Sequence, residues 1–189
     1  MKKTIAILLV LMLAMTSAFA AFIQIGPTGR YQGDLTDMDQ LRDVSNYAIG
    51  LDTRINLGVV DIAACGTVNA DFKEAFMAST FTSVNARFDL TLLELSFGAG
   101  TDLTIGNNFD GFEGEWRVNG EEISSFFDVL KSSKFDARIA AGVNLGGLGL
   151  NVAYRVPFKT LGDLISGDYA DVQNFNKGVA SISLLLNIF

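Results

Sequence analysis

The segment from Tyr47 to Leu57 changes chemical character at every position. Mostly large apolar residues occupy every second place, and the places between them hold small or polar residues that include Asp52 and Arg54. Successive side chains of a β-strand point to opposite faces, so this stretch predicts one strand with an apolar face and a polar face. An amphipathic helix would instead repeat its apolar residues every three or four positions. The alternation therefore favours a two-faced β-sheet.

The same alternation recurs along the chain in pairs of segments. The six clearest strands are expected at 47–57, 61–72, 83–92, 94–105, 135–145 and 148–158. Tight turns join these strands into three hairpins. Two weaker strands, one from Phe22 onward and one at 178–189, would close the sheet. Gly26-Pro27 interrupts the first of them and predicts a bulge, because proline has no N–H to donate to a regular ladder.

The polar face lacks the long solvated side chains of a strand that faces water. It carries no lysine, and many glycine, alanine and serine residues lie between its charges. The interior of an eight-stranded barrel is only wide enough for side chains, so a mixture of small and charged residues suits it. We therefore expect the polar face to line the interior and the apolar face to contact lipid. In a soluble lipocalin-like carrier, the same strands would have the apolar face inside and the polar face in water. Such a carrier is the second alternative to the membrane barrel.

The lengths of the strands and their connections also fit a membrane barrel. Strands of about 11 residues can cross a bilayer when tilted. Short turns alternate with longer connections, as in barrels with short periplasmic turns and longer extracellular loops. Four outward aromatic residues would mark the rim at the long-loop end, namely Tyr47, Phe72, Phe135 and Phe158. The expected fold class is an all-β, antiparallel, up-and-down transmembrane β-barrel of about eight strands.

Residues 1–20 have the features of a secretory signal peptide. A basic start precedes an apolar run, and Ala18-Phe19-Ala20 forms a small-residue cleavage site. No later stretch reaches the roughly 18 uncharged apolar residues that a spanning helix needs. We therefore expect a signal peptide at 1–20, an outer-membrane β-barrel domain at 21–189, and a location in the cell outer membrane.

Charged residues with inward parity make up the candidate functional site. Charges in a confined interior need partners to offset their desolvation, so one interpretation is a salt-bridged plug. This interpretation is favoured, because long arginine side chains would fill so small a barrel. The alternative is a selectivity lining for a narrow pore. The residues assigned to this network are Asp52, Arg54, Asp71, Arg87, Asp89, Asp102, Asp136, Arg138 and Arg155, and Asp61 and Glu94 share their parity.

Composition argues against several classes of function. The chain contains no histidine, which removes the commonest general base and the commonest metal ligand. We therefore expect no catalytic residue, no metal site and no cofactor. The formal net charge is −7, and removal of the basic leader makes it more negative. A nucleic-acid partner is disfavoured for that reason.

The longest connection, near 107–132, contains two distinct pieces. Residues 115–118 followed by Asn119-Gly120 predict an extension of a hairpin with a tight turn. Apolar residues at helical spacing then predict a short helix that caps the mouth, lies at the membrane surface or binds a partner. These apolar residues are Ile123, Phe126, Phe127 and Leu130.

The leader, the up-and-down hairpins and the terminal Asn187-Ile188-Phe189 resemble those of the small outer-membrane barrels of the OmpA, OmpX and OmpW kind. The resemblance covers nearly the whole mature chain and is architectural. In that group a C-terminal phenylalanine belongs to the signal read by the barrel-assembly machinery, so the resemblance implies this role for Phe189. Phe189 has the opposite parity to Ile188, which departs from a simple outward strand end.

Together these features predict a non-enzymatic outer-membrane barrel with a structural or surface-interaction role. The expected partners are outer-membrane lipid, the barrel-assembly machinery and an extracellular molecule that contacts the loops. The alternative function is a narrow OmpW-like channel for small molecules.

Overall fold

The computed structural model describes residues 22–69, 75–90, 92–108, 116–119, 121–122, 129, 131–160 and 176–188. The expected signal peptide, Asp71, Phe72 and Phe189 lie outside these residues, as does most of the helix expected in the longest connection. None of the helices in the described part of the chain is long and apolar enough to cross a membrane.

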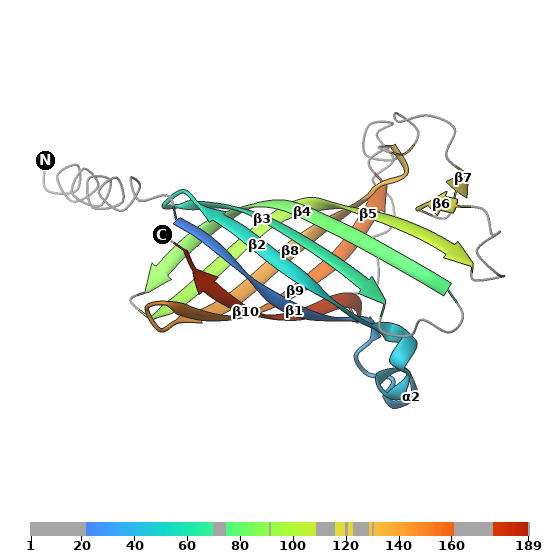
Figure 1. The fold of residues 1–189 in the computed structure, drawn as a ribbon, viewed down its shortest axis with the longest axis horizontal. Coiled ribbons are helices and arrows are strands. Elements are labelled where there is room, and N and C mark those ends of the chain that lie inside the picture. The colour runs from blue at the N-terminus through green and yellow to red at the C-terminus, as the bar shows by residue number, and fades with distance from the viewer. Residues whose placement is uncertain are drawn as a thin grey trace, which may run out of the picture.

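Eight long strands form a barrel in which neighbours in sequence are also neighbours in space. Each strand pairs antiparallel with the next one, and the last pairs with the first, so that the wall is closed (Figure 1). This confirms the predicted fold class. The strands are β1 (Phe22–Asp34), β2 (Tyr47–Asn56), β3 (Val60–Asn69), β4 (Ala75–Leu90), β5 (Leu93–Asn108), β8 (Lys134–Asn144), β9 (Leu148–Thr160) and β10 (Lys177–Asn187).

The closed wall separates two chemical environments. On β2, Ile49 and Leu51 are exposed on the outside, whereas Asp52 and Arg54 are buried inside. The outward residues of the other strands follow the same rule, and together they form what we call the apolar belt. Its residues include Ile23, Ile49, Leu51, Ile55, Ile62, Val84, Phe88, Leu95, Phe97, Ile139, Val143, Leu150, Val152, Ile182, Leu184 and Leu186. A soluble carrier would have the reverse arrangement, because water does not favour so large an apolar surface.

The two ends of the barrel differ in the length of their connections. The turns between β2 and β3, β4 and β5, and β8 and β9 are short, and Figure 1 places them at the same end as the start of β1 and the end of β10. In two of these turns Gly58 and Gly146 have positive φ angles of 77° and 83°, which glycine adopts without steric cost. The opposite end carries α2 (Met38–Arg42), the 3-10 helix η1 (Val44–Asn46), and the hairpin of β6 (Trp116–Val118) and β7 (Glu121–Glu122).

The bulge predicted at Gly26-Pro27 is wrong. β1 keeps one register with β2, and its register with β10 is the same on both sides of these residues. A Cβ atom on Gly26 would run into the carbonyl group of Leu184 in β10, so glycine allows two strands to approach closely there. The wall is irregular instead in β8 just before Asp136, opposite Pro157. Pro157 is thus the proline that lies at a bulge.

Candidate functional site

The barrel interior contains the charged residues that strand parity carries inward. Most of the charged residues predicted to face inward are buried there, namely Asp52, Arg54, Asp61, Arg87, Glu94, Asp102, Asp136, Arg138 and Arg155. Asp89 differs, because it lies near the short-turn end and its side chain is 49% exposed. Its carboxylate still reaches Arg87, with an Nε to Oδ1 distance of 2.9 Å. Asp71 lies outside the described residues.

A first cluster of charges occupies the short-turn half of the interior. The Arg54 guanidinium donates to Asp52 and to the side-chain oxygen of Asn151, both at 2.7 Å, and lies 3.8 Å from Glu94. Arg87 reaches the same Glu94 carboxylate at 3.2 Å. Because Arg54 is only 1% exposed, these contacts replace water around its charge.

A second cluster occupies the long-loop half. Nη1 of Arg155 lies 2.9 Å from Asp102 and 3.5 Å from Asp136, and the guanidinium stacks 4.0 Å from the ring centroid of the buried Phe81. Arg30 shares Asp102 at the longer distance of 3.9 Å. The two acids thus lie mainly around Arg155, and Arg30 is at the outer edge of the cluster.

Arg138 and Asp61 are held by neutral groups in the part of the chain that the structure describes. Arg138 donates to the Ser96 hydroxyl at 3.3 Å, and no ion pair within 4.0 Å is found for it among the described residues. Asp61 accepts a hydrogen bond from the Asn85 amide at 2.5 Å. The interior therefore contains ion pairs together with hydrogen bonds from neutral side chains.

Arg30 is a buried interior residue that the sequence reasoning missed. Its guanidinium donates to the hydroxyls of Thr67, at 3.2 Å, and Ser79, and to the Gln32 side chain at 2.5 Å. The signal was present, because Arg30 has the same parity as Gly26 in the same strand. The expected bulge at Gly26-Pro27 would break the alternation before Arg30, so the parity of Arg30 follows only once β1 is known to be regular.

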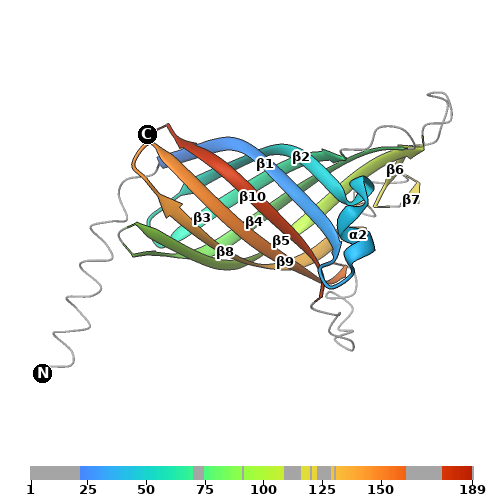
Figure 2. The same cartoon turned by 90° about the horizontal axis from the view of Figure 1, so that it is seen from below.

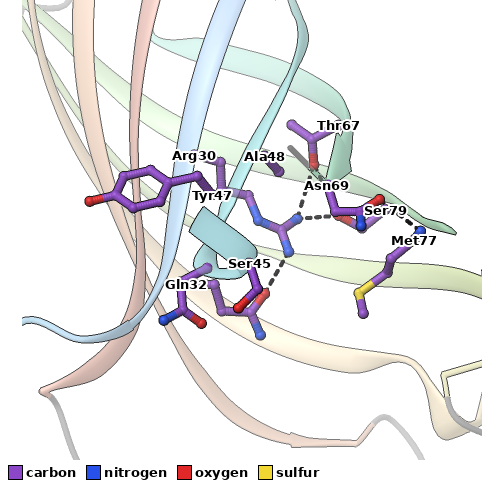
Figure 3. A pocket seen from close by; sticks show the side chains of 10 residues that line it. Arg30, Gln32, Ser45, Tyr47, Ala48, Thr67, Asn69, Met77 and Ser79 are labelled. Carbon is purple, nitrogen blue, oxygen red and sulfur yellow. Dashed lines mark hydrogen bonds between the residues drawn. The ribbon is translucent and has the colours of Figure 1, made fainter. Parts of the chain in front are cut away.

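A cavity of about 290 Å³ opens at the long-loop end, next to Arg30. Figure 3 shows the Arg30 guanidinium directed toward Thr67 and Ser79, while the ring of Tyr47 points away from it. Strands β1 to β4 and η1 supply the lining, which includes Arg30, Ser45, Asn46, Thr67, Met77 and Ser79. The cavity is a recess in the barrel mouth with both polar and apolar lining, and buried Arg30 forms part of its wall.

The interior offers little to a metal ion. Within the described ranges, no group of three or more Cys, Asp or Glu side chains is arranged to hold one. The carboxylates that could bind a cation contact arginines instead, as Asp52 and Asp102 do. The arrangement can neutralise and fill the interior, and it places the Arg30 side chain in the wall of the mouth cavity.

Neither protein-family models nor curated proteins match this chain. Among solved structures, the N-terminal β-barrel domain of Pseudomonas aeruginosa OprF matches with a TM-score of 0.54 and 11% sequence identity. The match covers 89% of this chain and all of that domain. The fold is that of a small outer-membrane β-barrel. At this identity the likeness describes the fold alone.

Two further outer-membrane barrels are similar at lower scores. Neisserial surface protein A matches with a TM-score of 0.46 and 13% identity, over 88% of this chain and 94% of its own. Ail, the attachment invasion locus protein of Yersinia pestis, matches with a TM-score of 0.47 and 12% identity, over 88% of this chain and 95% of its own.

The apolar belt indicates that this barrel lies in a membrane. Closed barrels satisfy every backbone group within the wall and can therefore cross a bilayer, with apolar residues facing lipid. The protein is an outer-membrane protein with its short turns on the periplasmic side and its long loops outside.

Proposed function

We propose that this outer-membrane barrel is a non-enzymatic structural and surface-interaction protein whose interior is a plug rather than a pore. The observation that carries the proposal is the burial of the interior side chains. Arg54 is 1% exposed, and Asn56 and Asp61 are fully buried. Charged and amide groups without exposure leave little room for a file of water or ions.

The ion pairs explain why the plug should stay in place. Removing one partner from a buried ion pair leaves an uncompensated charge, which typically costs about 3–5 kcal/mol. Arg54 and Arg155 each contact two carboxylates, so opening a path would break several such contacts together. The absence of histidine from the sequence argues against the usual hydrolytic triads.

Planar bilayer recording of the pure refolded protein tests the plug. We expect no discrete current steps from the natural protein. The variant Arg54→Ala with Arg155→Ala removes one large side chain from each half of the interior, and we expect small steps from it once gel mobility shows that it is folded. Those steps would show that insertion occurs and that side chains block the natural barrel. Reproducible steps from the natural protein would instead establish the alternative, a narrow OmpW-like channel.

The mouth cavity supports the surface-interaction part of the proposal. A recess that is open at the extracellular end and lined by Arg30, Ser45 and Asn46 offers hydrogen-bond donors to an outside partner. The same cavity is the one feature that favours the channel, since it could serve as a vestibule. Beneath it Arg155 stacks on Phe81, which favours a closed recess.

Assembly of the barrel is proposed to depend on Phe189 as the signal read by the assembly machinery. This proposal rests on the sequence resemblance. Deletion of Phe189 should lower the amount of folded protein in the outer membrane of cells and leave refolding into detergent micelles unchanged. If cells contain as much folded variant as natural protein, Phe189 is not part of the signal. If the variant also fails to refold in detergent micelles, Phe189 acts in stability instead.

A further inference from the structure

The first extracellular loop, residues 35–46, is folded against the outside of the wall. Tyr31 and Tyr47 are opposite each other in the β1–β2 pair, on the face that bears Ile49, and their ring centroids are 5.2 Å apart. Tyr47 is 38% exposed, but Tyr31 is only 7% exposed although it belongs to the outer face. The Tyr31 hydroxyl donates to the Asp34 carbonyl at 3.1 Å, and that of Tyr47 donates to the Leu41 carbonyl at 2.7 Å. Both tyrosines therefore tie the loop to the outer rim.

Hydrogen bonds within the loop fix the position of α2. Asp37 caps this helix by accepting from the backbone N–H groups of Asp39 and Gln40. The Gln40 side-chain oxygen accepts from the Asp34 N–H at 3.0 Å, and the Asn46 amide donates to the Gln40 carbonyl at 2.9 Å. Figure 1 shows α2 to the side of the barrel at its long-loop end, and Figure 2 places it at the same end.

The loop exposes three apolar side chains at this place. Met38 is 62% exposed, Val44 is 57% exposed and Leu35 is 43% exposed. They belong to the loop that Tyr31 and Tyr47 tie to the outer face of the wall, on which Ile49 is exposed. Exposed apolar residues next to an established lipid-facing surface, with an aromatic residue at the boundary, are typical of segments that lie in a membrane interface.

We propose that Leu35, Met38 and Val44 insert into the outer leaflet, so that α2 anchors the first loop at the lipid surface. The acidic residues of this helix, Asp37, Asp39 and Asp43, keep their charges on the aqueous side of the interface, where Asp37 and Asp43 also accept hydrogen bonds from the loop's own backbone. The inference rests on the membrane location and is independent of whether the barrel conducts.

The anchor would also set the shape of the mouth. Ser45 and Asn46 follow α2 directly and line the cavity beside Arg30. A loop held outward at Met38 and Val44 keeps these two residues at the cavity wall and holds the loop away from the opening. The lipid surface would thereby keep the mouth cavity open to the outside.

Two native methionines allow a direct test. From residue 21 onward the chain contains only Met38 and Met77. Met38 lies in the proposed anchor, whereas Met77 is 46% exposed and lines the mouth cavity. Protein with ¹³C-methyl methionine is placed in phosphatidylcholine nanodiscs, and the variants Met38→Leu and Met77→Leu identify the two methyl signals.

The readout is broadening of each methyl signal by a nitroxide-labelled lipid and by a water-soluble gadolinium chelate. We expect the lipid nitroxide to broaden Met38 more than Met77, and gadolinium to broaden Met77 more than Met38. Val44→Gln should reduce the lipid broadening of Met38 and leave Met77 unchanged, whereas Arg42→Gln, a change at an exposed neighbour in α2, should alter neither. Gadolinium broadening of Met38 equal to that of Met77, without lipid broadening, would overturn the proposal.

Discussion

Arg54 is the side chain that joins most of the partners in the periplasmic half of the interior. It contacts Asp52, Glu94 and Asn151 while almost fully buried. Substitution of Arg54 by Met keeps most of its volume and removes its charge, which leaves two carboxylates without their shared cation. We expect the free energy of unfolding to fall by about 3 kcal/mol, within the range for a broken buried ion pair. Urea unfolding in lipid vesicles, followed by gel mobility, measures this loss.

Arg42→Met is the matched control for that change. Arg42 is exposed in the first loop, where removal of a charge changes stability by less than about 0.5 kcal/mol. Equal stability of the Arg54 variant and the control would contradict the plug, because it would mean that the interior charges are solvated rather than mutually compensated.

Asp43 gives the first loop a defined response to acid. Hydrogen bonds from the Ser45 backbone N–H, at 3.0 Å, and from its side chain hold the pKa of the Asp43 carboxyl below its ordinary value of 3.8. Because the pKa is lower in the folded loop than in the unfolded chain, the ionised carboxyl stabilises the fold at any pH above the ordinary pKa. This contribution is lost as the pH falls through the lowered pKa. We expect η1 to stay intact down to pH 3.8. A titration of the Asp43 carboxyl carbon by NMR should therefore show a midpoint below pH 3.8. A midpoint above pH 3.8 would contradict the capping hydrogen bonds of Asp43.

Which charged residues lie inside the barrel could be predicted from the sequence, whereas their partners could not. Parity placed Arg54 and Arg155 inside because alternation needs only the local sequence. It did not identify which acid pairs with which arginine, since those contacts join residues of distant strands, as in Arg155 with Asp102. Asp89 has inward parity but lies too close to the barrel end to be buried.

At the scale of the strand, glycines control how closely the backbones approach. Gly26 and Gly29 both belong to β1, but they point to opposite faces. A Cβ on Gly26 would collide with the Leu184 carbonyl of β10, whereas a Cβ on Gly29 would lie at an ordinary 3.8 Å from the Ile182 side chain. We expect Gly26→Ala to open the seam between the first and last strands and to abolish the compact band in unboiled gels.

Gly29→Ala is the control for the seam and should fold like the natural protein. If both variants give the compact band in equal amount, the close approach of β1 and β10 does not determine closure. If neither variant gives the compact band, β1 tolerates a Cβ atom at neither glycine position. The open outer surface at Gly29 argues against that result.

The inward glycines of other strands refine an expectation from the sequence. Their small size suggested spacers for a cramped interior. The structure shows that a Cβ on Gly50 would meet the backbone of Gly66, and that a Cβ on Gly100 would meet the backbone of Thr82. The space they provide is thus used by the neighbouring strand, as expected where a barrel wall coils strongly.

Short elements in the loops were harder to predict than the strands. α2 was not predicted, although Asp37 and Gln40 form a capping pair in which the Gln40 amide donates to the Asp37 carboxylate at 3.0 Å. Five residues are too few for an apolar period to be recognised. The hairpin turn at Asn119 was predicted and is present, with a positive φ of 54°.

At the scale of the whole molecule, the sequence predicts the barrel because one pattern repeats in every hairpin. Closure itself depends on the pairing of β1 with β10, which are far apart in sequence and individually weak as predicted strands. It could be inferred only from the need of an apolar wall to leave no open edge in lipid. The functions of the loops depend on partners and could not be inferred from alternation.

The central claim is that the apolar face points outward into a membrane and the charged face points inward. Refolding into phosphatidylcholine vesicles without detergent, followed by flotation and by gels of boiled and unboiled samples, tests it most directly. We expect the protein to float with the vesicles and to migrate differently before and after boiling. Folded protein that remains in the aqueous fraction as a soluble monomer would contradict the membrane barrel and favour the lipocalin-like carrier.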